Sequence, residues 1–425
     1  MKISNFNELA ENDLRKAGLL IAEAGLQAID TKEAIKQAVF LREGDLVVKD
    51  LKIPLSGFSR IFVVSVGKCA LDAAFALKDI FGDRLNGGFA YGIKPEEIPG
   101  IEVLVGDHPF PSDKNAVNSE KIRLFLEGLG ENDFVVFVVS GGGSALLSDP
   151  RDFDAEKEKE IMKKLFREGA DIKEINTIRK HISFVRGGNL AKAAYPAKGV
   201  SLIFSDVPGD AIEFVASGPT VKDTTTVADA EEVLRKYNIK DGIEEGGLME
   251  TPKDDKYFVN VLNILLVSNN VALEAMAKRA GELGFRSEIM NDVMDGEAIE
   301  AGKKICETLR EEPSKTALLY GGETVVVVKG DGKGGRNQEL ALSALRFIEE
   351  GELILTLASD GRDNTEAAGA ICDIISKTRA AEKGLDPEEY LERNDSFSFF
   401  ERTRDQIITG PTGSNVADLV IAIKQ

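Results

Sequence analysis

The amino-acid sequence predicts an α/β protein of two domains, the first with a doubly wound, mostly parallel sheet and the second with a smaller, mixed sheet. At 425 residues the chain is long for one hydrophobic core, so two domains are expected. Short apolar strands alternate with glycine-rich turns and amphipathic helices, which is typical of a parallel sheet covered on both faces. A charged, glycine-rich stretch at 238–257 interrupts this pattern and indicates domains at 1–245 and 255–425.

Composition excludes several classes of protein. A formal charge of −19 argues against a nucleic-acid or anionic-membrane partner, because both require a basic surface. No stretch approaches the roughly 20 apolar residues of a membrane span, and the N-terminus lacks the apolar core of a signal peptide. Three cysteines without a C-x-x-C pair and only two histidines exclude a disulfide framework and a histidine-rich metal site. We therefore expect a cytoplasmic protein.

The first strand–turn–helix unit, "RIFVVSVGKCALDAAFALKDIF" at 60–81, places Lys68 at the tip of a strand. Lys68 does not belong to a Walker A motif, because Phe62 and Cys69 stand where that motif needs Gly and Ser or Thr. A lone lysine at a strand end is more often a surface residue. Beside a second anion-binding loop it becomes a candidate for contacting a phosphoryl group.

The second unit, "DFVVFVVSGGGSALLSD" at 133–149, supplies such a loop between an apolar strand and a predicted helix. Three consecutive glycines let backbone N–H groups point at an anion, and a helix N-terminus adds positive potential. The alternative is a tight turn without a ligand. We predict an anion-binding turn formed by Ser140, Gly141, Gly142, Gly143 and Ser144.

A basic cluster follows in "EINTIRKHISFVRGG" at 174–188, where Arg179, Lys180, His181 and Arg186 gather in an otherwise acidic protein. An anionic substrate needs such a local cluster to overcome the negative charge of the whole molecule. Arg179 and Lys180 are therefore candidate binding residues, with a solvated helix face as the alternative.

Four aspartates stand at the ends of two further predicted strands. Asp206 and Asp210 lie in "FSDVPGD", and Asp360 and Asp363 in "LASDGRDNTEAAGA". Carboxylates beside phosphate-binding loops suit Mg²⁺, which takes one or two carboxylates together with phosphate oxygens. Turn or helix-capping aspartates are the alternative for each of the four.

The second domain contains "TALLYGGETVVVVKG" at 316–330, which predicts two antiparallel strands joined by Gly321-Gly322. Gly330, Gly332 and Gly335 then form a G-x-G-x-x-G pattern before a helix, which is a dinucleotide signature, and Asp360 ends the next strand.

The residues around this pattern favour another chemistry. Arg336 and Asn337 start the helix, and "GPTGSN" supplies a second glycine-rich loop with hydroxyl groups. Such groups bind oxyanions, and phosphoryl transfer depends mainly on positioning and charge stabilisation. We therefore interpret the loop as part of a phosphoryl-transfer site.

The motifs as a set resemble those of the MOFRL-type (class II) glycerate 2-kinases over nearly the whole chain. The resemblance is carried, in order, by "VGKCA", "GDHPFP", "SGGGSALL", "INTIRKHIS", "SDVPGD…ASGPT", "GGETVVVVKGDGKGGRNQELALSA", "SDGRDNTEAAGA" and "ITGPTGSNVADL". One departure is Asn364, which stands where family members often have Gly. The resemblance implies a Rossmann-like first domain and a MOFRL-type second domain.

It also implies ATP- and Mg²⁺-dependent phosphorylation of D-glycerate to 2-phosphoglycerate in a cleft between the two domains. Lys68 and Arg336 match the residues regarded as catalytic, and we expect both on loops outside the core. The further motif residues expected at phosphate or substrate are Glu323, Asn337, Thr412 and Asn415. A homodimer is the candidate assembly.

Two alternatives remain. Family members have also been labelled hydroxypyruvate reductases, which makes an NAD(P)H-dependent oxidoreductase the second hypothesis. A non-catalytic sugar-acid sensor would need the anion-binding loops but neither Lys68 nor Arg336, so the presence of both argues against it.

Overall fold

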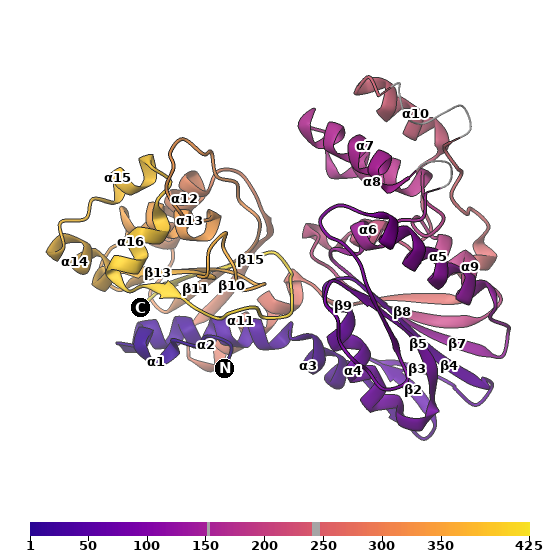
Figure 1. Ribbon diagram of the computed structural model, residues 1–425. Coiled ribbons are helices and arrows are strands. Elements are labelled where there is room, and N and C mark those ends of the chain that lie inside the picture. Colours follow the sequence, from indigo (N-terminus) through magenta and orange to yellow (C-terminus); the bar gives the residue numbers. More distant parts are fainter. Residues whose placement is uncertain (151–153, 240–246) are drawn as a thin grey trace. The chain divides into compact units, whose positions relative to one another are not determined.

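The computed structural model describes residues 1–150, 154–239 and 247–425, so part of the predicted boundary at 238–257 lies outside the described residues. The chain forms two compact units (Figure 1). We call them the parallel-sheet unit, Thr31–Val207 with Ala211–Leu266, and the mixed-sheet unit, Met1–Asp30 with Pro208–Asp210 and Val267–Gln425. In the described part of the chain, no helix combines the length and the apolar character that crossing a membrane requires.

The parallel-sheet unit confirms the predicted doubly wound sheet. Its strand order is β6-β5-β4-β7-β8-β9, and the pairs β4–β5, β5–β6, β4–β7 and β7–β8 are parallel. The chain winds outward from β4 in one direction and from β7 in the other, so the topological switch point lies between these strands. The strands are β4 (Arg60–Val66), β5 (Leu85–Gly92), β6 (Glu102–Val105), β7 (Asp133–Ser140), β8 (Lys198–Phe204) and β9 (Val261–Val267).

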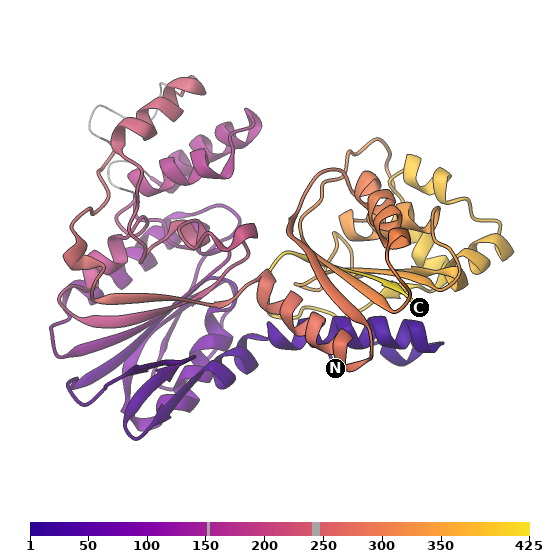
Figure 2. The ribbon, with the colours of Figure 1, turned by 180° about the vertical axis from the view of Figure 1, so that it is seen from behind.

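Burial explains the continuous apolar runs of these strands. All eight residues of β7 are buried, as are the residues of β4 after Arg60, because helices cover both faces of the sheet. Figure 2 shows the sheet from behind, with helices on either side of it. The helices of the unit are α3 (Thr31–Ala38), α4 (Ala70–Phe81), α5 (Asp113–Glu127), α6 (Gly143–Leu146), α7 (Ala155–Arg167), α8 (Ile172–His181), α9 (Asn189–Ala194) and α10 (Val227–Lys236).

Two parts of this unit were not predicted. A small antiparallel sheet contains β1 (Val39–Arg42), β2 (Asp45–Val48) and β3 (Leu51–Ile53). Helices α7, α8 and α10 form a layer beyond the main sheet, with a separate core that includes Ile161, Ile178 and Val233 (Figure 1). This helical layer carries the basic cluster.

The mixed-sheet unit confirms the second predicted sheet, in the order β10-β11-β15-β12-β13-β14. Only the β10–β11 pair is parallel; the other neighbours are antiparallel. The strands are β10 (Arg286–Met294), β11 (Thr316–Gly322), β12 (Glu352–Ala358), β13 (Gly369–Asp373), β14 (Gln406–Ile407) and β15 (Asp418–Lys424). The helices are α1 (Phe6–Leu9), α2 (Asp13–Ala28), α11 (Asn269–Glu282), α12 (Ala298–Glu311), α13 (Arg336–Leu345), α14 (Ile374–Glu382), α15 (Pro387–Glu392) and α16 (Ser396–Thr403).

The predicted hairpin at Gly321-Gly322 is wrong. Strand β11 does end at Gly322, but its antiparallel neighbour is β15 from the C-terminus, and residues 324–328 form no strand. Since β15 satisfies the free edge of β11, the valine run continues as a surface segment, where Val328 is 74% exposed.

The domain limits expected at 1–245 and 255–425 differ from the observed units at two places. Strand β9 completes the parallel sheet, although it follows the charged stretch. Residues 1–30 belong to the mixed-sheet unit, where Arg15 of α2 is fully buried and pairs with Asp373 and Asp405 at 2.6 and 2.9 Å. The distant ends of the chain thus form one unit.

Candidate active site

The tips of β4 and β7 meet at the switch point of the parallel sheet. Lys68 donates its backbone N–H to Gly141 at 2.9 Å, and Ser140 Oγ donates to the Val66 carbonyl at 3.1 Å. Gly67 has a φ of +115°, and a Cβ there would lie 2.2 Å from Ser140 Oγ, so only glycine permits this approach. The two predicted loops are therefore neighbours, in the crevice where such sheets bind ligands.

The Lys68 side chain is exposed and, within the described ranges, forms no ion pair. It shares its surroundings with His108, which follows β6. A Cβ on Gly142 would lie 3.2 Å from Lys68 Cγ and 3.4 Å from His108 Nε2. Burial, and then the charge of Lys68, lower the pKa of His108 below its usual value of 6.5. The imidazole is therefore neutral at pH 7.

His108 was not among the candidates proposed from the sequence. Its signal was available, because it is one of only two histidines and stands in the "GDHPFP" motif. Because His108 lies 40 residues after Lys68 in the sequence, the sequence did not indicate that both lie beside Gly142.

The turn Ser140–Ser144 connects β7 to α6, and α6 has only four residues. A single helical turn contributes little dipole, so any affinity of this turn for anions depends on its backbone and neighbours. Asp206, at the end of β8, is one such neighbour: a Cβ on Gly141 would lie 1.9 Å from Asp206 Oδ2. Lys68, His108 and Asp206 thus surround the glycine turn.

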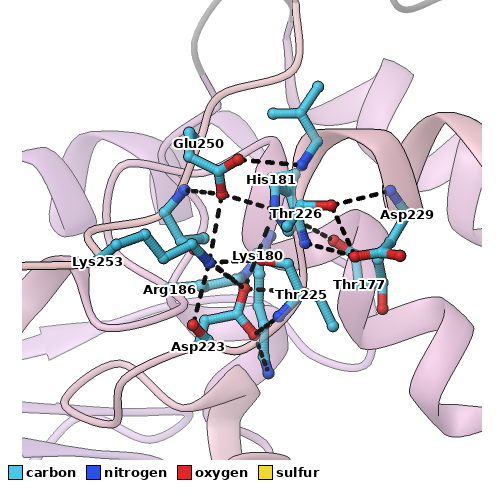
Figure 3. A network of polar contacts seen from close by, with 12 residues as sticks. Thr177, Lys180, His181, Arg186, Asp223, Thr225, Thr226, Asp229, Glu250 and Lys253 are labelled. Carbon is cyan, nitrogen blue, oxygen red and sulfur yellow. Dashed lines mark hydrogen bonds and ion pairs between the residues drawn. The ribbon is translucent and has the colours of Figure 1, made fainter.

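Two members of the basic cluster, Lys180 and Arg186, are paired with carboxylates. Lys180 faces Asp223, and His181 faces Glu250 (Figure 3). The Lys180 Nζ–Asp223 Oδ1 distance is 3.0 Å, and the His181 Nε2–Glu250 Oε1 distance is 3.5 Å. Arg186 is fully buried and pairs with Glu158 at 2.7 Å. Lys180, a candidate binding residue, therefore has a carboxylate partner of its own and helps to hold α8 against the chain around Asp223.

Arg179 differs from its three neighbours. In the part of the chain that the structure describes, no carboxylate lies within 4.0 Å of its guanidinium, and this alone sets it apart, because its unpartnered buried Nε is matched by Arg186 Nε and His181 Nε2. Burial, and then the charge of Arg186, lower the pKa of Arg179 to about 10, so the side chain remains charged at pH 7.

In the mixed-sheet unit, Arg336 begins α13 and is held on two sides. Its Nε donates to Asp418 Oδ2 at 2.5 Å, and its Nη2 lies 2.8 Å from Glu323 Oε1. Burial opposes the charge, but the hydrogen bond and charge of Asp418 outweigh it and raise the pKa of Arg336. Arg336 thus lies on a helix and not on a loop, and Asp418, unpredicted from the sequence, orients it.

Asp363 caps α13. Its carboxylate accepts the backbone N–H groups of Asn337 and Gln338 at 3.1 and 2.8 Å, and both side-chain amides as well. Asp360 accepts one backbone N–H, from Arg362 at 3.0 Å. Asn364 has a φ of +57°, a conformation that glycine and asparagine adopt more readily than other residues. Of the two aspartates, Asp360 is therefore the more available to a ligand.

The remaining candidates lie near these residues or serve local structure. Thr412 donates its hydroxyl to the Ser359 carbonyl at 2.6 Å, and its backbone N–H reaches the Asp360 carbonyl at 3.2 Å. Asn415 accepts from the Ala417 N–H at 3.4 Å. Asp210 accepts from the Asn270 amide at 3.1 Å.

The G-x-G-x-x-G loop has a structural explanation. A Cβ on Gly330 or Gly332 would lie 2.4 or 2.5 Å from the Arg393 carbonyl oxygen, and Gly332 donates its N–H to that oxygen at 3.0 Å. Two of the glycines therefore allow the loop to pack on the connection between α15 and α16. This packing removes the need for a dinucleotide to explain them.

Each unit thus presents one cation of the predicted pair, Lys68 or Arg336, together with carboxylates and glycine turns. No group of three or more His, Cys, Asp or Glu side chains in the described ranges could hold a metal ion by itself. Cations beside glycine turns are suited to binding anions.

Comparison with known proteins gives consistent results. Two family models match, a domain of unknown function (DUF4147) over residues 18–246 and the MOFRL family over residues 316–418. The chain is 38% identical to the glycerate 2-kinase of Pyrococcus horikoshii, with 97% of each chain covered. It is 36% identical to the D-glycerate 2-kinase of Thermotoga maritima, with 96% of this chain and 98% of that protein covered. A crystal structure of a glycerate kinase from Thermotoga maritima has a TM-score of 0.88 at 35% identity, covering 96% of this chain and 99% of that one.

Proposed function

Because the chain belongs to the MOFRL-type (class II) family of glycerate 2-kinases, we propose that it phosphorylates D-glycerate at the C2 hydroxyl with ATP. The hydroxyl oxygen forms a bond to the terminal phosphorus, the bond from that phosphorus to the bridging oxygen breaks, and the hydroxyl proton passes to a base. The products are 2-phosphoglycerate and ADP.

The observation that carries this proposal is Lys68 at the switch point. It is an exposed ammonium without a carboxylate partner in the described ranges, beside a glycine turn at the carboxyl end of β7. A compact cation at this position can neutralise charge on a phosphoryl group in transfer. The neighbouring His108, neutral at pH 7, can accept the hydroxyl proton.

Arg336 supplies the second positive charge. Asp418 and Glu323 fix its guanidinium by 2.5 and 2.8 Å contacts, and Asn337 follows it at the start of α13. A planar guanidinium can bind two oxygens of a phosphoryl group or a carboxylate at once. We assign Arg336 to that contact and Lys68 to the developing charge.

Mg²⁺ fits the carboxylates of both units, because it prefers oxygen ligands and takes one or two carboxylates beside phosphate oxygens. Asp206, Asp210, Asp360 and Asp363 are the residues that would hold it, and Asp363 is the least available of the four because its oxygens cap α13. When bound, Mg²⁺ would neutralise charge on the nucleotide phosphates.

A pair of assays tests the proposal. The purified chain with ATP, Mg²⁺ and D-glycerate should form ADP and a product that enolase converts, which separates 2- from 3-phosphoglycerate. The oxidoreductase hypothesis expects hydroxypyruvate-dependent oxidation of NAD(P)H. Oxidation of the nicotinamide without release of ADP would exclude the kinase.

The composition supports two subordinate proposals, a cytoplasmic location and small-molecule substrates without nucleic acid. We also propose a homodimer. Light scattering of the purified chain measures its mass directly, and a mass of one 46.0 kDa chain would exclude that assembly.

A further inference from the structure

Four basic side chains lie at the end of α8 or shortly after it, and three of them have an acidic side chain within 4.0 Å. Lys180 pairs with Asp223, His181 lies near Glu250, and Arg186 pairs with Glu158. The acidic side chains come from other parts of the chain, so each of these three basic side chains has its own acidic neighbour.

Arg179 has no ion-pair partner within 4.0 Å in the described ranges, and the nearest acidic influence on it is the charge of Glu158, which pairs with Arg186. Within the same ranges, the Nε of Arg179 is closed to solvent and has no hydrogen-bond partner. A buried charge without a partner is costly, and proteins normally pair it. A guanidinium in this state is suited to an anion that arrives with a ligand.

The turn of α8 that carries Arg179 is tied to the glycine turn after β7. Asn176, three residues earlier on the same face of α8, accepts the Ser217 hydroxyl at 2.7 Å. Ser217 Oγ in turn lies 3.1 Å from Ser144 Oγ, and Arg186 donates to the Ser144 carbonyl at 2.6 Å.

Backbone strain marks the same place. Ala216 and Ser217 adopt φ values of +51° and +60°, and Gly218 follows with +59°. Left-handed conformations of non-glycine residues are unfavourable and concentrate at functional sites. Here they bring Ser217 between Asn176 and Ser144, and the Ala216 side chain against Gly143.

We propose that Arg179 binds the carboxylate of the hydroxy-acid acceptor, at a subsite next to the turn Ser140–Ser144. This inference rests on the proposed function and names the part of the site that recognises the acid. One unpaired positive charge matches the single negative charge of a carboxylate. The more highly charged nucleotide phosphates would leave excess negative charge next to Arg179, where Glu158 already contributes a negative charge.

Thermal melting without nucleotide tests binding apart from catalysis. D-glycerate should raise the Tm of the wild-type chain, whereas glycerol, which lacks the carboxylate, should not. In Arg179→Met the shift with D-glycerate should disappear, and the Tm without ligand should be no lower than in the wild type, because a buried unpaired charge has been removed. Arg167→Met is the matched control: Arg167 is an exposed arginine of α7, and both Tm values should be unchanged.

Kinetics give an independent measurement. Losing a hydrogen-bonded charge contact costs about 1.5–3 kcal/mol, so Arg179→Met should raise KM for D-glycerate about 10- to 100-fold with KM for ATP unchanged. Arg179→Lys keeps the positive charge but lacks the planar pair of donors. Its KM for D-glycerate should lie between those of the wild type and Arg179→Met.

The possible outcomes separate the two proposals. If D-glycerate raises the Tm in an Arg179-dependent way but no turnover is seen, the subsite is supported and the proposed kinase activity is excluded. Turnover with an unchanged KM for D-glycerate in both Arg179 variants would remove the subsite and leave the kinase. A rise in KM for ATP alone, or a wild-type Tm that D-glycerate does not move, would also overturn the subsite.

Discussion

Lys68 and Arg336 carry the same charge in different surroundings. Lys68 is exposed without an ion-pair partner in the described ranges, whereas Arg336 is held by Asp418, which is only 2% exposed. The expectation that both lie on loops outside the core therefore holds for Lys68 alone. The two residues should respond differently to the same substitution.

We predict that Lys68→Ala and Arg336→Ala each lower kcat by about 10²–10³ with a parallel fall in kcat/KM, because each removes a contact to transferring charge. Steady-state assays check this. A Lys68→Ala enzyme with near wild-type turnover would remove Lys68 from the mechanism.

Stability should separate the two variants. Lys68→Ala should leave the Tm unchanged. Arg336→Ala should destabilise the fold by about 1–3 kcal/mol, because it leaves the buried Asp418 without its partner. Chemical denaturation measures both, and Arg336→Lys should recover part of the stability but not full activity, since the planar fork is lost.

His108 provides a pH-dependent prediction. Its pKa is lowered by burial and by Lys68, so the imidazole becomes charged only as the pH falls through a value below 6.5. In Lys68→Met the pKa of His108 should rise, because the repelling charge is gone. The chain has two histidines, so its imidazole NMR spectrum is simple, and His108→Gln assigns the signals. A titration of His108 that Lys68→Met leaves unchanged would contradict the observed arrangement.

At the scale of single elements, the start of helix α13 depends on Asp363, which lies 26 residues after Asn337 in the chain. Asp363 accepts backbone N–H groups at the helix start, where the first turn has no intrahelical partners. Thus the helix that presents Arg336 begins correctly only when the loop after β12 is in place.

We expect Asp363→Ala to lower the free energy of unfolding by about 1–2 kcal/mol, the usual effect of losing a helix cap. Asp360→Ala is the matched control, since Asp360 accepts one backbone N–H and lies three residues away. Urea titrations should show a clear loss in the first variant and a small one in the second. If both variants lose the same free energy of unfolding, the loss comes from disturbing the loop and not from removing the helix cap.

At the scale of the whole molecule, the mixed-sheet unit contains both ends of the chain. Helix α2 contributes Arg15, whose guanidinium is fully buried and pairs with Asp373 at 2.6 Å and Asp405 at 2.9 Å. Two carboxylates that lie 32 residues apart in the C-terminal part of the chain (405 − 373) thus share one cation from the N-terminal part.

Arg15→Met should therefore destabilise the protein strongly, by about 3–5 kcal/mol, because buried Asp373 loses its counter-ion and buried Asp405 is left with Arg379, at 3.2 Å. Hydrogen exchange should locate the loss in the mixed-sheet unit and leave the parallel-sheet unit protected. Lys16→Met, at the next and exposed position of α2, is the control and should change little. Equal deprotection of both units would show that they unfold together.

The sequence alone determined the α/β class, the two sheets and the positions of the glycine turns. Strand periodicity and the demand of tight turns for glycine are local properties, so they can be recognised in short stretches such as 60–81 and 133–149. The sequence also places Lys68 and Ser140–Ser144 at strand ends, but that their two strands are neighbours is known only from the observed strand order.

Only the tertiary structure decided which charges are already paired and which segments are neighbours. The basic cluster looks uniform in the sequence, yet Asp223 and Glu158 pair with Lys180 and Arg186, Glu250 lies near His181, and Arg179 has no ion-pair partner in the described ranges. The valine run after Gly322 has the composition of a strand, but β15 occupies the edge it would have joined. In each case the deciding partner is remote in the chain, and pairing between remote residues depends on the packing of the whole fold, which local pattern does not encode.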